Sequence, residues 1–221
     1  MEQIDIHAIS DDGEDAKTYI NGYVTPKRDS INLGIEARGT YLDFARSFTS
    51  SFLDQVEGHA NGAVRLIGPL DAINLTGQLV IDGNVHVTST NCWYEMRNDT
   101  LKIVPDEIEF AHCPIYDRDG REGILTGGMH HKNLTQLTYD IYADTQNLLA
   151  YDFKDFGDDT FYGTVYANGN VGIHGRDGSV VIDIDVTPLE GSTFVYNVAS
   201  PDAISSQEFI EWNTETDKSQ E

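Results

Sequence analysis

The sequence has few basic residues and no long apolar run. Its 221 residues include 14 Lys and Arg against 37 Asp and Glu, for a formal net charge of -23 at pH 7. A field of that sign repels phosphate backbones and anionic membrane surfaces, so we expect no nucleic-acid partner. Every apolar stretch is short and interrupted by Asp, Asn or Gly. A membrane-spanning helix needs about 20 mostly apolar residues, so none is expected in this chain.

Cysteine is also scarce, with only Cys92 and Cys113 in the chain. In an oxidising compartment the two can bridge, and in the cytosol they are small buried hydrophobes; both interpretations stay open at this point. Hydrophobic residues make up only 39% of the sequence. That fraction favours one slice of an elongated structure over a thick globular core.

Motifs for catalysis, metal binding and phosphate binding are missing as well. No G-x-S-x-G, no Ser/His/Asp order and no P-loop occurs, so we expect no enzyme, no catalytic residue and no cofactor. The glycines of FYGTVYANGNVGIHG, residues 161–175, are spaced G-x-x-G-x-x-G and lead into a strand, not the helix that a dinucleotide loop opens. His130 and His131 point to opposite sides of any strand, which predicts a surface turn and no metal site. DRDG at 117–120 lacks the later ligands of a calcium loop and is predicted as a hairpin turn.

What the sequence does contain is alternation of apolar and polar residues. Ile31, Leu33 and Ile35, for example, alternate with Asn32 and Gly34, the period of a half-buried strand. Clusters such as Asp-Gly-Asn at 82–84 predict tight turns between antiparallel strands. Four segments repeat a loose pattern of glycine, alternating apolar residues and glycine at irregular spacing, which differs from a fixed-period solenoid.

These patterns predict an all-β fold. We expect stacked hairpins in one long, antiparallel-rich sheet over residues 1–204, with glycines where its inner face is narrow. A polar, disordered tail is expected at 205–221.

One amphipathic helix is predicted over about 41–55, in TYLDFARSFTSSFLDQVEG. Leu42, Ala45, Phe48, Phe52 and Leu53 recur near helical spacing, and the glycine at 58 is its expected stop. The apolar stripe of this helix, Phe48 included, is expected to pack on the sheet.

Longer stretches of the chain resemble a known family. The run YLDFARSFTSSFLDQVEGHANGAVRLIGPLDAINLTGQLVIDGNVHV leads from an amphipathic segment into G-x-x-x-G-x-V-x-L-x-G-P-L and then I-x-L-x-G-x-L-x-I. It is similar to the C-terminal region of TamB, among the AsmA-like envelope proteins. IVPDEIEFAHCPIYDRDGREGILTGGMHH, and FYGTVYANGNVGIHG followed by SVVIDIDVTPLEGSTFVY, also resemble that family, most closely its Bacteroidetes-type versions. The resemblance covers most of residues 20–200.

The resemblance implies an elongated sheet folded lengthwise into an open β-solenoid-like trough with an apolar interior, a β-taco. Its glycines would let neighbouring strands bend sharply. Family members are anchored in the inner membrane, cross the periplasm and meet an outer-membrane barrel. They are implicated in phospholipid transport and outer-membrane protein assembly. On this basis we expect a non-enzymatic segment of a longer periplasmic envelope protein, with phospholipid acyl chains as ligands and a barrel protein as partner of the parent chain.

Apolar residues of one strand parity are the candidates for lining such a trough. An acyl chain needs a continuous, dry, apolar surface, because its burial contributes ~25 cal/mol per Å². The candidate lining residues are Leu66, Leu75, Leu79, Ile81, Leu137, Tyr139, Ile141, Val165, Val171, Ile173, Val180, Ile182, Ile184 and Val186. The alternative is that these side chains close onto one another, or onto the helix, as an ordinary core.

A second function class fits the same strands. A carbohydrate-binding or carbohydrate-cleaving β-solenoid would place exposed aromatic side chains or carboxylates together on one outer groove. The two hypotheses therefore assign function to opposite faces of the sheet.

Overall fold

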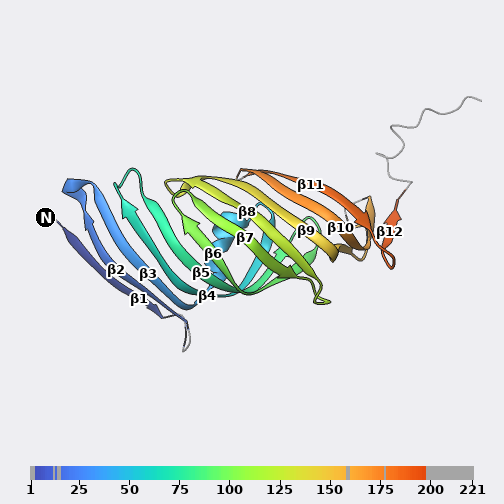
Figure 1. The fold of residues 1–221 in the computed structure, drawn as a ribbon, viewed down its shortest axis with the longest axis horizontal. Coiled ribbons are helices and arrows are strands. Elements are labelled where there is room, and N and C mark those ends of the chain that lie inside the picture. The colour runs from blue at the N-terminus through green and yellow to red at the C-terminus, as the bar shows by residue number, and fades with distance from the viewer. Residues whose placement is uncertain (1–2, 12, 14–15, 158–159, 177, 198–221) are drawn as a thin grey trace, which may run out of the picture.

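The computed structural model describes residues 3–11, 13, 16–157, 160–176 and 178–197. These residues form one long antiparallel sheet with 75% strand and 6% helix, which confirms the predicted all-β class (Figure 1). The predicted tail at 205–221 lies outside the described residues, as do residues 198–204 of the predicted trough.

The strands follow one another as a meander. They are β1 (Ile4–Asp11), β2 (Lys17–Thr25), β3 (Ser30–Tyr41), β4 (Leu53–Gly68), β5 (Asn74–Val87), β6 (Cys92–Val104), β7 (Glu107–Tyr116), β8 (Glu122–Lys132), β9 (Thr135–Phe153), β10 (Phe161–Arg176), β11 (Ser179–Pro188) and β12 (Thr193–Tyr196). Each strand from β1 to β11 pairs with the next, so the order in space is the order in the chain. β12 pairs with the first residues of β10, next to the stretch that pairs with β11. A short 3-10 turn, Pro26–Arg28, connects β2 to β3.

Alternation in the sequence becomes two different faces of the sheet, because successive strand residues point to opposite sides. One row of paired residues crosses all eleven strands of the meander and holds only aliphatic side chains, one methionine, one tyrosine and glycine. This row is Ala8, Ile20, Ile35, Val64, Gly77, Ile103, Ile108, Met129, Tyr139, Gly175 and Val180. The neighbouring row is Ile9, Tyr19, Glu36, Ala63, Gln78, Lys102, Glu109, Gly128, Asp140, His174 and Val181. We call the side of the first row the apolar face and the side of the second row the polar face.

The helix predicted over 41–55 is much shorter in the structure. A 3-10 turn, Leu42–Ala45, leads into a single turn of helix, α1 (Arg46–Thr49), and β4 already begins at residue 53. An isolated helix of this length is not stable in water, so packing must hold it in place. The helix therefore ends before the last two residues of the predicted apolar stripe, Phe52 and Leu53.

The segment of residues 42–52, which we call the plug, packs inside the curl of the sheet. Figure 1 shows it behind β6–β8. Leu42 and Phe52 are buried in the central core with residues from both walls of the sheet. Phe48 is 43% exposed, so its predicted place in the buried stripe is wrong. The plug covers the apolar face as expected, but the side chains that do so, Leu42 and Phe52, lie at its two ends.

Glycine allows two strands to approach closely where a turn was predicted. The Asp-Gly-Asn cluster at 82–84 lies inside β5, so the predicted turn there is wrong. Gly83 pairs directly with Gly58 of β4, and a Cβ atom on Gly83 would lie 2.1 Å from the carbonyl oxygen of Glu57. Both glycines are needed for close backbone contact, which is the meaning that glycine often has inside a strand. The DRDG sequence, in contrast, forms the predicted hairpin turn between β7 and β8.

Two truncations in the plug separate buried from exposed phenylalanine. We expect Phe52→Ala to lower the free energy of unfolding by ~3–5 kcal/mol, because the ring leaves a cavity in the core. Phe48→Ala should change it by only about 0.5 kcal/mol, as at other exposed sites. Urea denaturation followed by circular dichroism measures both values. Equal effects of the two substitutions would contradict this placement of the plug.

Candidate functional site: the apolar face and its closure

All fourteen predicted lining residues share the strand parity of the apolar face. Four of them are buried in the folded chain: Ile81, Tyr139, Ile141 and Val165. Nine are half-buried: Leu66, Leu75, Leu79, Leu137, Val171, Ile173, Val180, Ile182 and Val186. Ile184 is 57% exposed. The structure therefore brings the set onto one surface but covers only its middle.

Tyr139 shows how the middle of the apolar face is covered. Its ring meets the edge of the Phe52 ring, with the ring centroids 5.2 Å apart. Its hydroxyl donates a hydrogen bond of 2.6 Å to the backbone carbonyl of Phe48. Only 3% of Tyr139 is exposed. In this region the side chains form an ordinary closed core, which was the alternative interpretation of the sequence.

Part of the apolar face over β1–β5 has a different environment, although Ala60 of β4 and Ile81 of β5 belong to the core. Leu33, Leu66 and Leu75 lie side by side on three neighbouring strands. None of them belongs to the central core cluster or to the residues packed against it. Each is half-buried, so part of every side chain still contacts solvent. These three leucines form a partly open surface among the described residues.

Two walls of the sheet meet between β6 and β9. The Tyr94 hydroxyl donates a 2.7 Å hydrogen bond to the carbonyl of Leu149. The backbone N–H of Asp152 donates a 3.0 Å bond to the carbonyl of Thr90. Leu149 is almost fully buried beside this contact. These bonds close one side of the curl without closing the sheet into a barrel.

A chain of polar side chains runs across this closure. His86 Nδ1 lies 2.5 Å from an Asp54 carboxylate oxygen, and its Nε2 lies 3.1 Å from Asn91 Oδ1. The amide nitrogen of Asn91 donates to the carbonyl of Asp152, whose carboxylate pairs with Arg118. Both nitrogens of His86 therefore face an oxygen atom of a neighbouring side chain. The chain joins β4, β5, β9 and the β7–β8 turn.

Asp117 organises the β7–β8 turn next to that chain. Its Oδ1 accepts 2.9 Å bonds from the backbone N–H groups of Asp119 and Arg121, and its Oδ2 accepts one from Leu149. Asp117 is buried, so these three bonds replace its hydration. The DRDG sequence therefore fixes the turn to β9, a role that the spacing alone does not reveal.

Metal ligands do not assemble in the part of the chain that the structure describes. No group of three His, Cys, Asp or Glu side chains there is arranged to hold an ion. His130 and His131 belong to β8, and His131 is only 7% exposed. The prediction that these histidines form a surface turn is wrong for that reason. Burial lowers the pKa of His131, since desolvation disfavours the charged ring.

The two cysteines are free and buried. Burial raises the pKa of the Cys92 thiol to about 11 and that of the Cys113 thiol to about 12. Of the two interpretations that the sequence left open, the structure supports small buried hydrophobes. A neutral thiol is also a poor nucleophile, so neither side chain is set up for covalent chemistry.

Sequence reasoning missed several residues of the apolar face and all of the closure. Ile35, Val64, Ile103 and Met129 belong to the same row as Tyr139. The alternation of apolar and polar residues in each strand was the signal that could have identified them, once the strands are paired in chain order. The contacts of Asp54, His86 and Asp152 join distant parts of the chain, and no local sequence pattern indicates them.

No family model, curated protein or solved structure gives a significant match to the chain. Among the described residues, no helix has the length and apolar character required to cross a membrane.

Acid should weaken the closure through Asp54. A hydrogen bond from His86 lowers the pKa of Asp54 below its ordinary value. The stabilisation from this carboxylate is thus complete above its ordinary pKa and is lost as the pH falls through the lower folded value. We expect Asp54→Asn to reduce the loss of unfolding free energy between about pH 5 and about pH 2.5. Urea titrations at several pH values measure it.

Asp43→Asn, at an exposed aspartate of the plug, is the matched control. It should leave the pH dependence close to that of the wild type. An equal change in both variants would show that Asp54 has no special part in the closure.

Thiol labelling tests the burial of the cysteines. In the native chain at about pH 8, we expect neither Cys92 nor Cys113 to react with an aromatic disulfide reagent within minutes, because both thiols are buried and protonated. In denaturant both should react at once. Two thiols that stay unreactive in denaturant would indicate a disulfide, and fast labelling of the native chain would contradict the burial.

Proposed function

We propose that the chain is a non-enzymatic segment of a TamB-like envelope protein whose apolar face carries phospholipid acyl chains. The role would be intermembrane phospholipid transport, outer-membrane protein assembly, or both. The observation that supports this is the apolar row crossing eleven strands, of which the part over β1–β5 is left open by the plug.

The dimensions of the open part suit an acyl chain. Neighbouring strands lie ~4.8 Å apart, so the four steps from β1 to β5 cover roughly 19 Å. Half the hydrocarbon thickness of a bilayer is about 15 Å, the depth that one lipid tail occupies. A tail lying across the strands over Leu33, Leu66 and Leu75 would cover their exposed parts and gain ~25 cal/mol per Å² of apolar area.

The plug determines where on the face we place the lipid. Phe52 and Tyr139 fill the middle of the curl, so a tail cannot pass there while the plug is seated. We therefore assign acyl-chain contact to the open surface over β1–β5. Passage along the whole face would require the plug to leave, breaking the bond between the Tyr139 hydroxyl and the Phe48 carbonyl.

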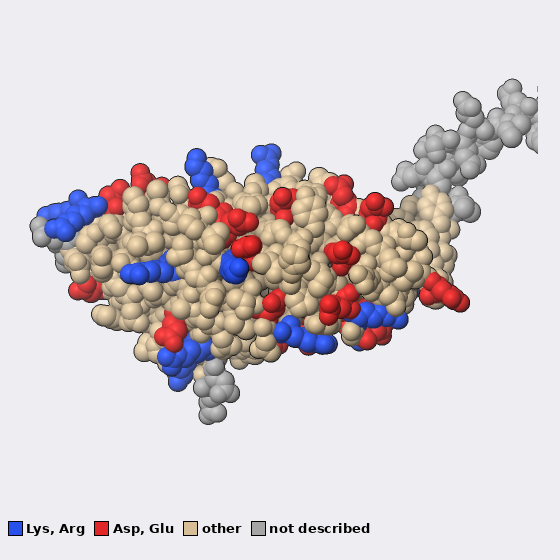
Figure 2. All heavy atoms as spheres, viewed as in Figure 1, with Lys and Arg blue, Asp and Glu red and all other residues tan. Residues whose placement is uncertain are grey.

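The distribution of carboxylate side chains favours a lipid-carrying role over a catalytic one. On the visible side of the molecule, acidic side chains are spread over much of the surface and do not gather in one hollow (Figure 2). Periplasmic location, an inner-membrane anchor on the parent chain and contact with an outer-membrane barrel follow from the resemblance. They belong to the same proposal.

Photocrosslinking at two adjacent positions tests the lipid assignment. Leu66 lies on the apolar face, and its neighbour Ile67 is an aliphatic residue on the polar face with 41% exposure. With a photoreactive amino acid at one position or the other, we expect crosslinked phospholipid from position 66 only. Mass spectrometry of the protein purified from a Gram-negative host identifies the adduct.

Circular dichroism should first show that both proteins fold alike. Leu75→Glu should then remove phospholipid that copurifies in native mass spectra, because burying an unpaired charge costs several kcal/mol. Thr76→Glu, on the polar face, should not. Crosslinking that is equal at positions 66 and 67, or found only at 67, would refute the lipid assignment.

A further inference from the structure

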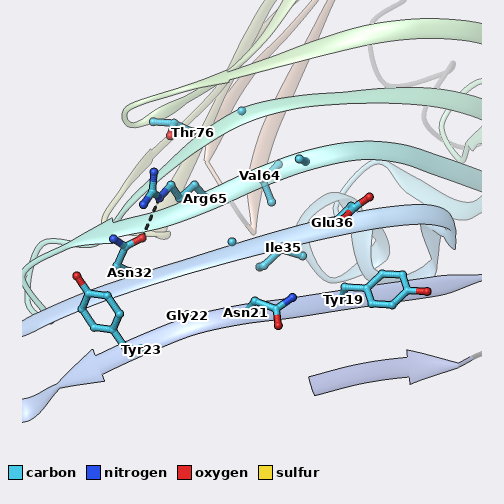
Figure 3. A pocket seen from close by; sticks show the side chains of 13 residues that line it. Tyr19, Asn21, Gly22, Tyr23, Asn32, Ile35, Glu36, Val64, Arg65 and Thr76 are labelled. Atoms are coloured by element: carbon cyan, nitrogen blue, oxygen red, sulfur yellow. Dashed lines mark hydrogen bonds between the residues drawn. The ribbon is translucent and has the colours of Figure 1, made fainter. Parts of the chain in front are cut away.

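The polar face carries a hollow of its own, separate from the lipid surface proposed above. It lies over β2–β5 and encloses about 640 Å³ (Figure 3). Asn21, Gly34, Arg65 and Thr76 are paired in one row across its centre. The hollow exists because Gly34 has no side chain and Ala63 on the next strand has a small one, while longer side chains stand around them.

Two tyrosines stand at opposite ends of this hollow. Tyr19 and Tyr23 belong to β2 and lie on either side of Asn21 in Figure 3. Tyr23 lies four residue steps along the strand from Tyr19, which is roughly 13 Å. Both residues are half-buried, so part of each still contacts solvent. Aromatic rings have a negative face that attracts C–H groups of a flat ligand lying on them.

The polar side chains of the hollow are held in position before any ligand arrives. Arg65 Nε donates a 2.8 Å hydrogen bond to Asn32 Oδ1. Arg38 Nε donates a 2.8 Å bond to Glu36, and the Arg38 guanidinium lies 4.9 Å from the centre of the Tyr19 ring. Side chains ordered in this way lose less conformational entropy on binding.

The hollow differs from the rest of the surface in its net charge. Its charged lining side chains are one Glu and one Arg, Glu36 and Arg65, so they cancel within a chain of net charge -23. An anionic ligand would find its only cation in the lining already bonded to Asn32. A lipid tail would have to desolvate these charges and the amides beside them, which is costly.

We infer that this hollow binds a neutral oligosaccharide. The two tyrosines stack on sugar rings, and the side chains of Asn21, Glu36, Arg65 and Thr76 exchange hydrogen bonds with their hydroxyl groups. The class follows from the combination of spaced aromatic faces, ordered uncharged or charge-balanced hydrogen-bonding groups and an open, elongated hollow. Every proposed contact is with a side chain of the polar face, so the inference can fail while the lipid proposal stands, and the reverse.

Gly34 offers a substitution that fills the hollow without harming the fold. A Cβ atom there would have only the carbonyl oxygen of Asn21 within 4 Å, at 3.7 Å. Gly34→Val therefore fits the strand, and β-branched residues suit strands. At the neighbouring Gly22, in contrast, a Cβ atom would lie 2.0 Å from the carbonyl oxygen of Asn32.

Affinity electrophoresis of the full chain in gels containing soluble xyloglucan, mixed-linkage β-glucan or galactomannan tests the inference. We expect at least one of these neutral polysaccharides to retard the wild-type chain. Gly34→Val and Tyr23→Ala should each weaken that retardation about tenfold or more, equivalent to 1.4 kcal/mol. Tyr142→Ala removes a tyrosine that is 45% exposed on β9, outside the hollow, and should change nothing.

Two outcomes overturn the inference. One is the absence of retardation in all three gels, also at millimolar concentrations of the matching oligosaccharides in calorimetry. The other is retardation that Gly34→Val and Tyr23→Ala leave unchanged, or that Tyr142→Ala weakens equally. Thermal melts of all variants, expected to match the wild type within a few degrees, show that any loss comes from the hollow and not from unfolding.

Discussion

Strand register is the constraint on which the rest of the structure depends. Eleven strands pair in chain order, and the row through Ile35, Ile103 and Tyr139 stays on one side throughout. A slip by one residue at any pair would send apolar side chains of the following strand to the polar face. Extra residues in β4 and β9 interrupt the ladder, yet the row continues across both of these strands. Both proposed binding surfaces are products of that conserved parity.

The plug converts part of this continuous surface into a core. A single curled sheet of this kind has no second layer, so its apolar face needs a cover from somewhere. Residues 42–52 supply it in the middle, and the β6–β9 contact seals one side. The ends receive less cover from the described residues, which explains why Leu66 and Ile184 are more exposed than Ile141. The closed core and the open surface are thus two regions of the same face.

Prediction from sequence worked where the information is local. Alternation identified the all-β class, and the residues proposed to line a trough do share one face. It failed at the plug, because near-helical spacing of Leu42, Phe48 and Phe52 cannot reveal that the strand β4 takes over at residue 53. It failed again at 82–84, where pairing of Gly83 with Gly58 overrides a turn signal. The closure joins residues such as Asn91 and Asp152, 61 positions apart, and only the folded chain brings them together.

The meander also has a consequence for how the molecule is made. Each strand pairs with a neighbour in the chain, so almost all of the sheet can form as soon as the next hairpin is available, with small loop-closure cost at every step. Folding can then follow synthesis from one end to the other. The exceptions are the bonds of the plug and closure, such as that between Tyr139 and Phe48, 91 residues apart. Those contacts cannot form until β9 has been made. A chain that ends before β9 would therefore leave its apolar face uncovered, and the plug would pack last.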